Sequence, residues 1–180
     1  SYRARDAENA NSAVIVQVSP DDYGGGLGGI EFQRQYEQLA FRQGSGSGAS
    51  GAYTAPVQRL GDFMAWRASS SFGAVRPSYP RGTCFSRLDE LLPGFITDGI
   101  RRAMPQFGSR LRGFDSWDAV LTGVEMRSSA PVRVLRGEDM QSTGVRGLYP
   151  AGEGAGYAGG IVSAGVDGVR VAERIAAAVS

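Results

Sequence analysis

The C-terminal stretch, residues 147–180, constrains the fold of this chain more than any other part. It reads GLYPAGEGAGYAGGIVSAGVDGVRVAERIAAAVS. The pattern predicts a short strand over residues 147–151, a glycine-rich loop over residues 152–160 and a helix from about Ala158 to the C-terminus. Glycines let the backbone approach a ligand closely, and the first turn of a helix leaves N–H groups unpaired. Together the three elements favour an anion-binding site.

The glycine spacing in this loop has two interpretations. Gly154-x-Gly156-x-x-Gly159 formally matches the dinucleotide-binding fingerprint. That fingerprint also requires a following strand with an acidic residue about 20 positions further on, and here the sequence stops inside the predicted helix. We therefore expect the loop not to be the first turn of a dinucleotide-binding unit. It can hold a phosphate or a ribityl chain by its backbone, or it is a turn that only packs the helix on a strand.

The preceding residues predict a mainly helical region between two groups of strands. The β-branched run at residues 12–18 predicts a strand, and a loop covers residues 20–29. Helices are predicted over residues 29–43, 57–67 and 94–104, the last with Pro93 at its first position and Phe95, Ile96, Ile100 and Met104 as its apolar stripe. Further helical turns are predicted over residues 85–92 and 105–111. Short strands are predicted over residues 119–122, 124–126 and 131–135, an extended segment over 53–56, and loops over 44–51 and 68–84.

This order of elements predicts an α+β insert domain followed by the closing strand–loop–helix of an α/β, Rossmann-like domain. A parallel sheet needs helices on both faces and strands on both sides. A single strand–loop–helix is therefore incomplete as a doubly wound sheet, and we expect its neighbouring strands to come from another part of a longer chain.

The composition excludes several kinds of chemistry. All 19 basic residues are Arg, with neither Lys nor His. This excludes a Lys Schiff base, a phosphate-loop Lys, a Ser-His-Asp triad and a His metal site. Cys84 is the only cysteine, which excludes an internal disulfide and a Cys-rich zinc site, so no metal site is predicted. The net charge of +1 gives no electrostatic case for nucleic acid or an anionic membrane as a partner. Without a signal peptide or a long apolar run, a cytoplasmic protein is expected.

A family resemblance rests on stretches spread along most of the chain. They are NANSAVIVQV, GGIEFQRQYEQLAF, YTAPVQRLGDFM, VRPSYPRG, LTGVEMRSSAPVRVLR and GLYPAGEGAGYAGGIVSAGVDGVRVAERI. With these, the chain resembles the C-terminal portion of a bacterial family of FAD-dependent dehydrogenases or uncharacterised FAD-utilising oxidoreductases, which are two-dinucleotide-type flavoproteins. The resemblance implies FAD as cofactor, a small-molecule substrate, and a nicotinamide cofactor as a candidate electron donor or acceptor.

The resemblance also implies a domain organisation. Residues 1–20 would connect to the FAD domain, 21–117 would form the insert or substrate domain, 118–146 would return as short strands, and 147–180 would close the FAD site. The N-terminal glycine fingerprint that holds the adenosine diphosphate half is not in this sequence. We therefore expect a C-terminal fragment that is inactive alone.

The same resemblance indicates which residues would meet the cofactor. The candidates are Gly152, Glu153, Gly154, Ala155, Gly156, Tyr157, Gly159, Gly160 and Ile161. A carboxylate at position 153 can accept hydrogen bonds from ribityl hydroxyls, or it can simply interact with the helix dipole. Tyr157 would either stack on a ring or pack. No residue stands out as a general acid or base.

Arg127 and Ser128 are the candidates for the substrate side of the flavin. A fixed Arg beside hydroxyl groups can hold a carboxylate, whereas the alternative is a surface hairpin with a Glu125–Arg127 pair. The predicted function is thus an FAD-dependent oxidoreductase. The alternative is a non-catalytic interaction module whose glycine-rich loop is only structural.

Overall fold

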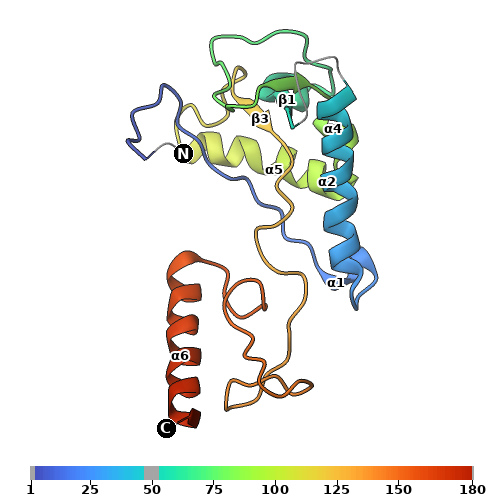
Figure 1. Ribbon diagram of the computed structural model, residues 1–180. Coiled ribbons are helices and arrows are strands. Elements are labelled where there is room, and N and C mark those ends of the chain that lie inside the picture. The colour runs from blue at the N-terminus through green and yellow to red at the C-terminus, as the bar shows by residue number, and fades with distance from the viewer. Residues whose placement is uncertain (1–2, 47–52, 180) are drawn as a thin grey trace. The chain divides into compact units, whose positions relative to one another are not determined.

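In the computed structural model, the described residues are 3–46 and 53–179. They form two compact units (Figure 1). The first unit comprises residues 1–18 and 35–124, and the second comprises residues 19–34 and 125–180. Helix α2 (Gly28–Gly46) contributes residues to both.

A three-stranded mixed sheet organises the first unit. The strand order is β2-β1-β3, with β1 (Ala55–Arg59) in the middle. It pairs in parallel with β2 (Thr83–Phe85) and antiparallel with β3 (Val120–Thr122). The first four residues of β1 are buried, as expected for a central strand covered on both faces.

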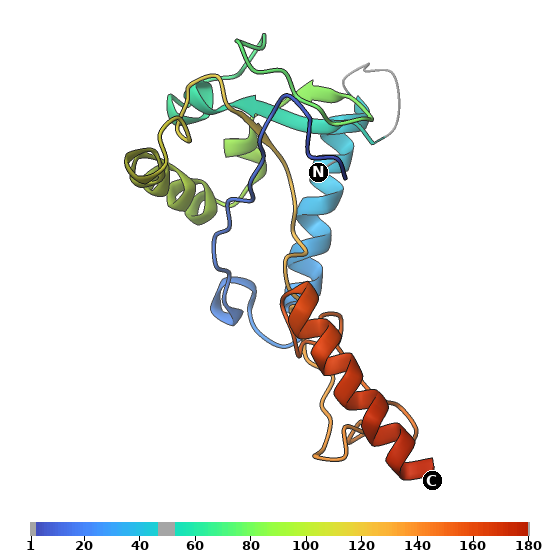
Figure 2. The same cartoon turned by 90° about the vertical axis from the view of Figure 1, so that its left-hand side faces the viewer.

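Helices supply the apolar core against this sheet. Short helices α3 (Leu60–Met64) and α4 (Leu88–Leu91) follow β1 and β2 directly, and α5 (Gly94–Arg110) lies along one face of the sheet (Figures 1 and 2). Their buried apolar residues, each at most 8% exposed, pack with the fully buried Val57 of β1: Leu60, Phe63, Leu88, Leu91, Ile96, Ile100 and Met104.

The core of the first unit also contains a polar side chain. Gln58 is completely buried, and its amide donates to the Arg67 carbonyl at 2.8 Å and accepts from the Leu88 N–H at 2.8 Å. A buried polar group without such partners would cost free energy. Gln58 therefore joins β1 to the first residue of α4, Leu88, and to Arg67 in the segment after α3.

The second unit contains little regular structure besides its helices. Helix α1 (Pro20–Tyr23) begins with a capping box between Ser19 and Asp22 and ends at Gly24, whose φ is +79°. Residues 125–160 are turns and irregular segments, and α6 (Ile161–Val179) ends the unit. Gln33 in α2 donates to the carbonyls of Met126 and Ser129 at 2.9 and 3.3 Å, which holds residues 126–129 against the helix.

Several predicted elements are confirmed. The fold class α+β is correct, as are the helices at α2, α4, α5 and α6 and the strand at β3. Helix α2 extends to Gly46, so the first part of the loop predicted over residues 44–51 is helical, and residues 47–52 lie outside the described residues. The Rossmann-like assignment and the four domain boundaries remain predictions.

The predicted helix over residues 57–67 is wrong at its start. Val57, Gln58 and Arg59 belong to β1, and only Leu60–Met64 is helical. The apolar spacing that suggested a helix reflects burial on both faces of a central strand, which periodicity alone does not distinguish.

The helix predicted over residues 94–104 and the helical turn predicted over residues 105–111 are one element, because α5 continues through Pro105 to Arg110. Pro93 occupies the N-cap rather than the first helical position. Ile96, Ile100 and Met104 are buried as predicted, whereas Phe95 is 39% exposed.

Four predicted strands are absent from the described residues. They are residues 12–18, 124–126, 131–135 and 147–151. A strand requires a continuous ladder of hydrogen bonds to a neighbour. Segments 131–135 and 147–151 have only scattered backbone hydrogen bonds, such as that from the Val134 N–H to the Ala155 carbonyl and that from the Ser142 N–H to the Leu148 carbonyl. Gly147 also has a φ of +80°, which interrupts an extended run.

Candidate functional site

The glycine loop, residues 152–160, is folded back on itself. The N–H of Gly156 donates to the Glu153 carbonyl at 2.9 Å, and the N–H of Tyr157 donates to the Gly152 carbonyl at 3.0 Å. Gly152 and Gly156 have φ values of +70° and +83°, a region that side chains disfavour. The loop therefore has a defined conformation, and α6 starts at Ile161.

A buried ion pair holds this loop to the helix. Arg136 donates through Nη2 to Asp167 Oδ1 at 2.6 Å and through Nη1 to Oδ2 at 3.0 Å, in a bidentate arrangement. The side chains are only 8% and 12% exposed. Asp167 Oδ2 also accepts from the Gly152 N–H at 2.8 Å, and Arg136 Nη1 donates to the Pro150 carbonyl at 2.7 Å. The ion pair thus fixes the backbone both just before the loop, at Pro150, and at its first residue, Gly152.

Tyr157 belongs to the same cluster. Arg136 lies over its ring at 3.7 Å from the centroid, and Arg133 lies at 5.0 Å. Its hydroxyl donates to the Val134 carbonyl at 3.1 Å and accepts from the Arg136 N–H at 3.1 Å. Of the two interpretations of Tyr157, packing inside the protein is the one that this geometry favours.

Each member of the ion pair shifts the pKa of the other. The Arg136 guanidinium and the Gly152 N–H lower the pKa of the Asp167 carboxyl to about 2 from an ordinary value of 3.8, and the same contact raises the pKa of Arg136. A carboxyl whose folded-state pKa is lowered contributes stability that is complete above its unfolded pKa and is lost as the pH falls through its folded pKa.

We therefore expect the ion pair to lose its contribution between about pH 4 and pH 2. The difference in unfolding free energy between the wild type and Asp167→Asn should shrink by about 2 kcal/mol over this window, since a tenfold difference in proton affinity between the folded and unfolded states corresponds to about 1.4 kcal/mol. Urea unfolding at a series of pH values measures this difference. A difference that stays constant down to pH 2 would contradict the assignment.

The glycines of the loop differ in what surrounds them. A Cβ at Gly156 would lie 2.5 Å from the Val132 carbonyl oxygen and 3.0 Å from the Arg133 Cα, so this glycine is required by packing within the protein. A Cβ at Gly154 would meet nothing within 4 Å. Only Gly154 leaves open space where a ligand could approach the backbone of the loop.

Glu153 and the start of α6 are available to a ligand. The Glu153 side chain is half-buried and forms no ion pair among the described residues. Ile161 and Val162, in the first turn of α6, are 95% and 80% exposed. The first N–H groups of a helix have no partner within the helix and carry its positive dipole end. This end of α6 can therefore accept a negatively charged or hydrogen-bond-accepting group.

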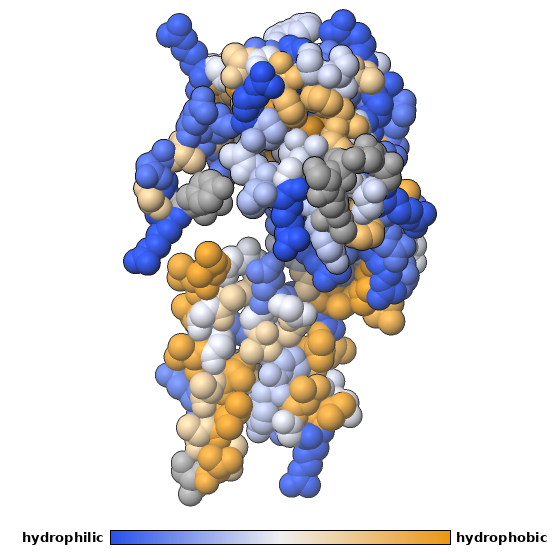
Figure 3. Space-filling model, turned by 45° about the horizontal axis from the view of Figure 1, so that its top comes forward, coloured by the Kyte–Doolittle hydropathy of each residue, from blue (hydrophilic) through white to orange (hydrophobic). Residues whose placement is uncertain are grey.

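Helix α6 also presents an apolar face to the surface. Val162, Val166 and Val169 follow one another at helical spacing and are 80%, 47% and 59% exposed. Figure 3 shows apolar surface along this helix. Asp167 and Val171, on another side of α6, are buried. The helix is thus covered on one side only within the described residues.

Arg127 and Ser128 lie in an exposed bend near the glycine loop. The Ser129 hydroxyl donates to the Ser128 carbonyl at 2.8 Å, and a Cβ at Gly159 would lie 3.6 Å from the same hydroxyl oxygen. The structure therefore brings the bend at residues 127–129 close to the end of the loop.

The sequence prediction missed Arg136 and Asp167. Asp167 falls among small and apolar residues on α6, and a charged residue on such a helix face is a signal that it has a buried partner. Nothing in the sequence identified Arg136 among the 19 basic residues as that partner.

The described residues offer neither a metal centre nor a membrane span. No group of three or more His, Cys, Asp or Glu side chains within them is arranged to hold a metal ion. None of their helices is long and apolar enough to cross a bilayer.

Comparisons with known proteins identify the family. Residues 1–128 match the family described as "FAD-dependent protein, C-terminal domain-like". An uncharacterized protein of Clostridium beijerinckii is 51% identical over 177 residues, which cover 97% of this chain and 32% of that protein. The chain thus spans about a third of the length of this relative. From the match of residues 1–128, the chain belongs to the family of C-terminal domains of FAD-dependent proteins.

Proposed function

We propose that this chain is the C-terminal part of an FAD-dependent oxidoreductase, a dehydrogenase of two-dinucleotide type, in which residues 152–161 close the flavin site. The observation that carries the proposal is the uncovered first turn of α6, which follows a loop fixed by the Arg136–Asp167 ion pair. Within a family of FAD-dependent proteins, such a preorganised loop and helix end suit the flavin side of the cofactor.

The residues of the loop fit this cofactor chemically. Glu153 supplies an acceptor for ribityl hydroxyls, and Gly154 leaves room for close approach to the backbone. The proposed contact segment also includes Gly152, Ala155, Gly159, Gly160 and Ile161. The internal contacts of Gly156 and Tyr157 give these two a supporting role, holding the loop rather than touching the ligand.

A bound flavin would supply hydride transfer, so the chain's own groups need only bind, orient and stabilise charge. The positive end of α6 would stabilise negative charge next to it. Arg127 and Ser128, in the bend beside Gly159, would hold an anionic group of a small-molecule substrate. A nicotinamide cofactor is the candidate electron donor or acceptor.

The rest of the flavin site would belong to residues outside this sequence. The relative from C. beijerinckii is about three times as long as the matched segment. The exposed valines of α6 would pack on a Rossmann-like sheet contributed by that remaining part. This explains why a helix in the second unit keeps an apolar face uncovered.

Titration of the flavin-free full-length protein with FAD tests the proposal. We expect the wild type to bind FAD and show the visible absorption of a protein-bound flavin, and Glu153→Ala to bind about tenfold more weakly, because a hydrogen bond to a charged group contributes about 1.5 kcal/mol or more. Glu173→Ala, an exposed carboxylate further along α6, is the matched control and should bind like the wild type.

The results for the wild type and for Glu153→Ala test the flavin function and the ribityl contact separately. A folded full-length wild type that keeps no flavin absorption after unbound FAD is removed by gel filtration would reject the flavin function and favour an interaction module with a structural loop. Normal affinity in Glu153→Ala, with a coloured wild type, would reject only the ribityl contact.

A further inference from the structure

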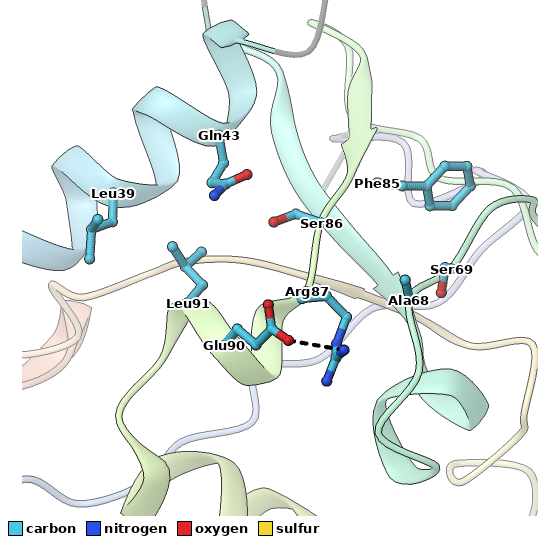
Figure 4. A pocket seen from close by; sticks show the side chains of 9 residues that line it. All are labelled: Leu39, Gln43, Ala68, Ser69, Phe85, Ser86, Arg87, Glu90 and Leu91. Carbon is cyan, nitrogen blue, oxygen red and sulfur yellow. Dashed lines mark ion pairs between the residues drawn. The ribbon is translucent and has the colours of Figure 1, made fainter.

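An open pocket of about 500 Å³ lies in the first unit, and none of its lining residues belongs to the site proposed above (Figure 4). It is lined by residues of α2, of the segment after α3, and of the passage from β2 into α4. These are Leu39, Gln43, Ala68, Ser69, Phe85, Ser86, Arg87, Glu90 and Leu91. Leu39 and Leu91 form an apolar side, and the side chains of Gln43 and Ser86 extend into the space opposite the Arg87–Glu90 pair.

The cationic group of this pocket is held in place from behind. Arg87 donates through Nε to Asp89 Oδ1 at 2.8 Å and through Nη2 to Asp89 Oδ2. The Asp89 side chain is completely buried and also pairs with Arg101 at 3.3 Å. The orientation of the guanidinium is thus fixed before any ligand binds, which reduces the entropic cost of binding.

The charges around the pocket do not balance within the protein interior. Arg87, Arg101 and Asp89 are 27%, 10% and 0% exposed and together carry one excess positive charge. The carboxylates that compensate it are exposed: Glu90, which contacts Arg87 Nη1 at 3.0 Å, is 67% exposed, and the exposed Asp98 acts on Arg101. An exposed ion pair of this kind is worth under about 1 kcal/mol. Arg101 Nη1 is in addition buried without a hydrogen-bond partner among the described residues.

A ligand carboxylate could therefore replace Glu90 at little cost. It would meet Arg87 Nη1 at the wall of the pocket, while an apolar body would contact Leu39 and Leu91. From this geometry we propose that the pocket binds a small monocarboxylic acid with an apolar body, in exchange for the Arg87–Glu90 contact. The proposal does not depend on whether the glycine loop binds a flavin.

Isothermal titration of the full-length protein with phenylacetate, and with its neutral analogue phenylacetamide, tests the proposal. We expect phenylacetate to bind and phenylacetamide to bind at least about tenfold more weakly, since only the carboxylate pairs with Arg87. Glu90→Gln removes the competing carboxylate and should tighten phenylacetate binding about two- to fivefold, the equivalent of an exposed ion pair. Ala68→Trp, at an exposed lining position, should abolish binding by filling the pocket.

Glu31→Gln is the matched control, because Glu31 is about as exposed as Glu90 (69% against 67%), pairs with Arg34 three residues further on and does not line the pocket. It should leave the affinity unchanged. The proposal is overturned by absence of phenylacetate binding, by equal binding of the amide, or by binding that survives Ala68→Trp. Weaker phenylacetate binding in Glu90→Gln would overturn it as well, because the Glu90 carboxylate would then not compete with the ligand for Arg87. The Glu90→Gln outcome stands on its own if Ala68→Trp does not fold.

Discussion

Asp167→Ala is expected to lower the free energy of unfolding by roughly 3 kcal/mol. Removing one member of a buried ion pair leaves the other charge buried without compensation, which costs more than the pair itself contributes. Here Arg136 is 8% exposed and would keep only the Pro150 carbonyl as a side-chain hydrogen-bond partner, and the Gly152 N–H would lose its acceptor as well. Urea unfolding monitored by circular dichroism measures the change.

Two further variants show whether the loss of stability comes from the ion pair or from any substitution in α6. Glu173→Ala changes an exposed residue of the same helix and should alter stability by less than about 0.5 kcal/mol. The double variant Arg136→Leu with Asp167→Leu should recover much of the loss, because no unpaired charge remains buried. Equal stability of Asp167→Ala and Glu173→Ala would show that the ion pair does not hold the loop.

Gly156→Ala is the second substitution with a large expected effect, a loss of roughly 3 kcal/mol. The methyl group would lie 2.5 Å from a backbone carbonyl oxygen, and the φ of +83° adds about 1–2 kcal/mol for a residue with a Cβ. The backbone at Val132 and Arg133 would have to move, and with it the hydrogen bond from Arg133 Nε to the Gly156 carbonyl. Thermal unfolding compares the variant with the wild type.

Gly154→Ala provides the contrast within the same loop. Its methyl group would enter open space, and its φ is not in the left-handed region, so stability should change by less than about 0.5 kcal/mol. If the loop closes a flavin site, this variant should instead weaken FAD binding in the full-length protein. Destabilisation by Gly154→Ala as large as that by Gly156→Ala would mean that the loop is packed differently from this structure.

Local patterns were sufficient for elements whose signals lie within a few residues. The apolar periodicity of α2, α5 and α6 predicted these helices, and the glycine cluster predicted a loop immediately before α6. Glycine at positions with positive φ, such as Gly152 and Gly156, follows from the absence of a Cβ.

Elements that depend on distant neighbours were predicted less well. Residues 57–59 have spacing compatible with a helix, but pairing with β2 and β3 on both sides makes them the central strand. The β-branched run at residues 12–18 has strand propensity, but no described residue supplies a pairing partner. Strand formation depends on such a partner, and this information is absent from a local window.

The sequence by itself determined that a glycine-rich loop precedes a C-terminal helix, that Lys and His chemistry is excluded, and that a carboxylate, Glu153, lies in that loop. The tertiary structure decided how that loop is held. Arg136 and Asp167 are 31 residues apart, and only folding brings the guanidinium onto the carboxylate and the Gly152 N–H onto the same oxygen. A long-range ion pair leaves no periodic pattern, because its energy depends on burial and geometry rather than on spacing along the chain.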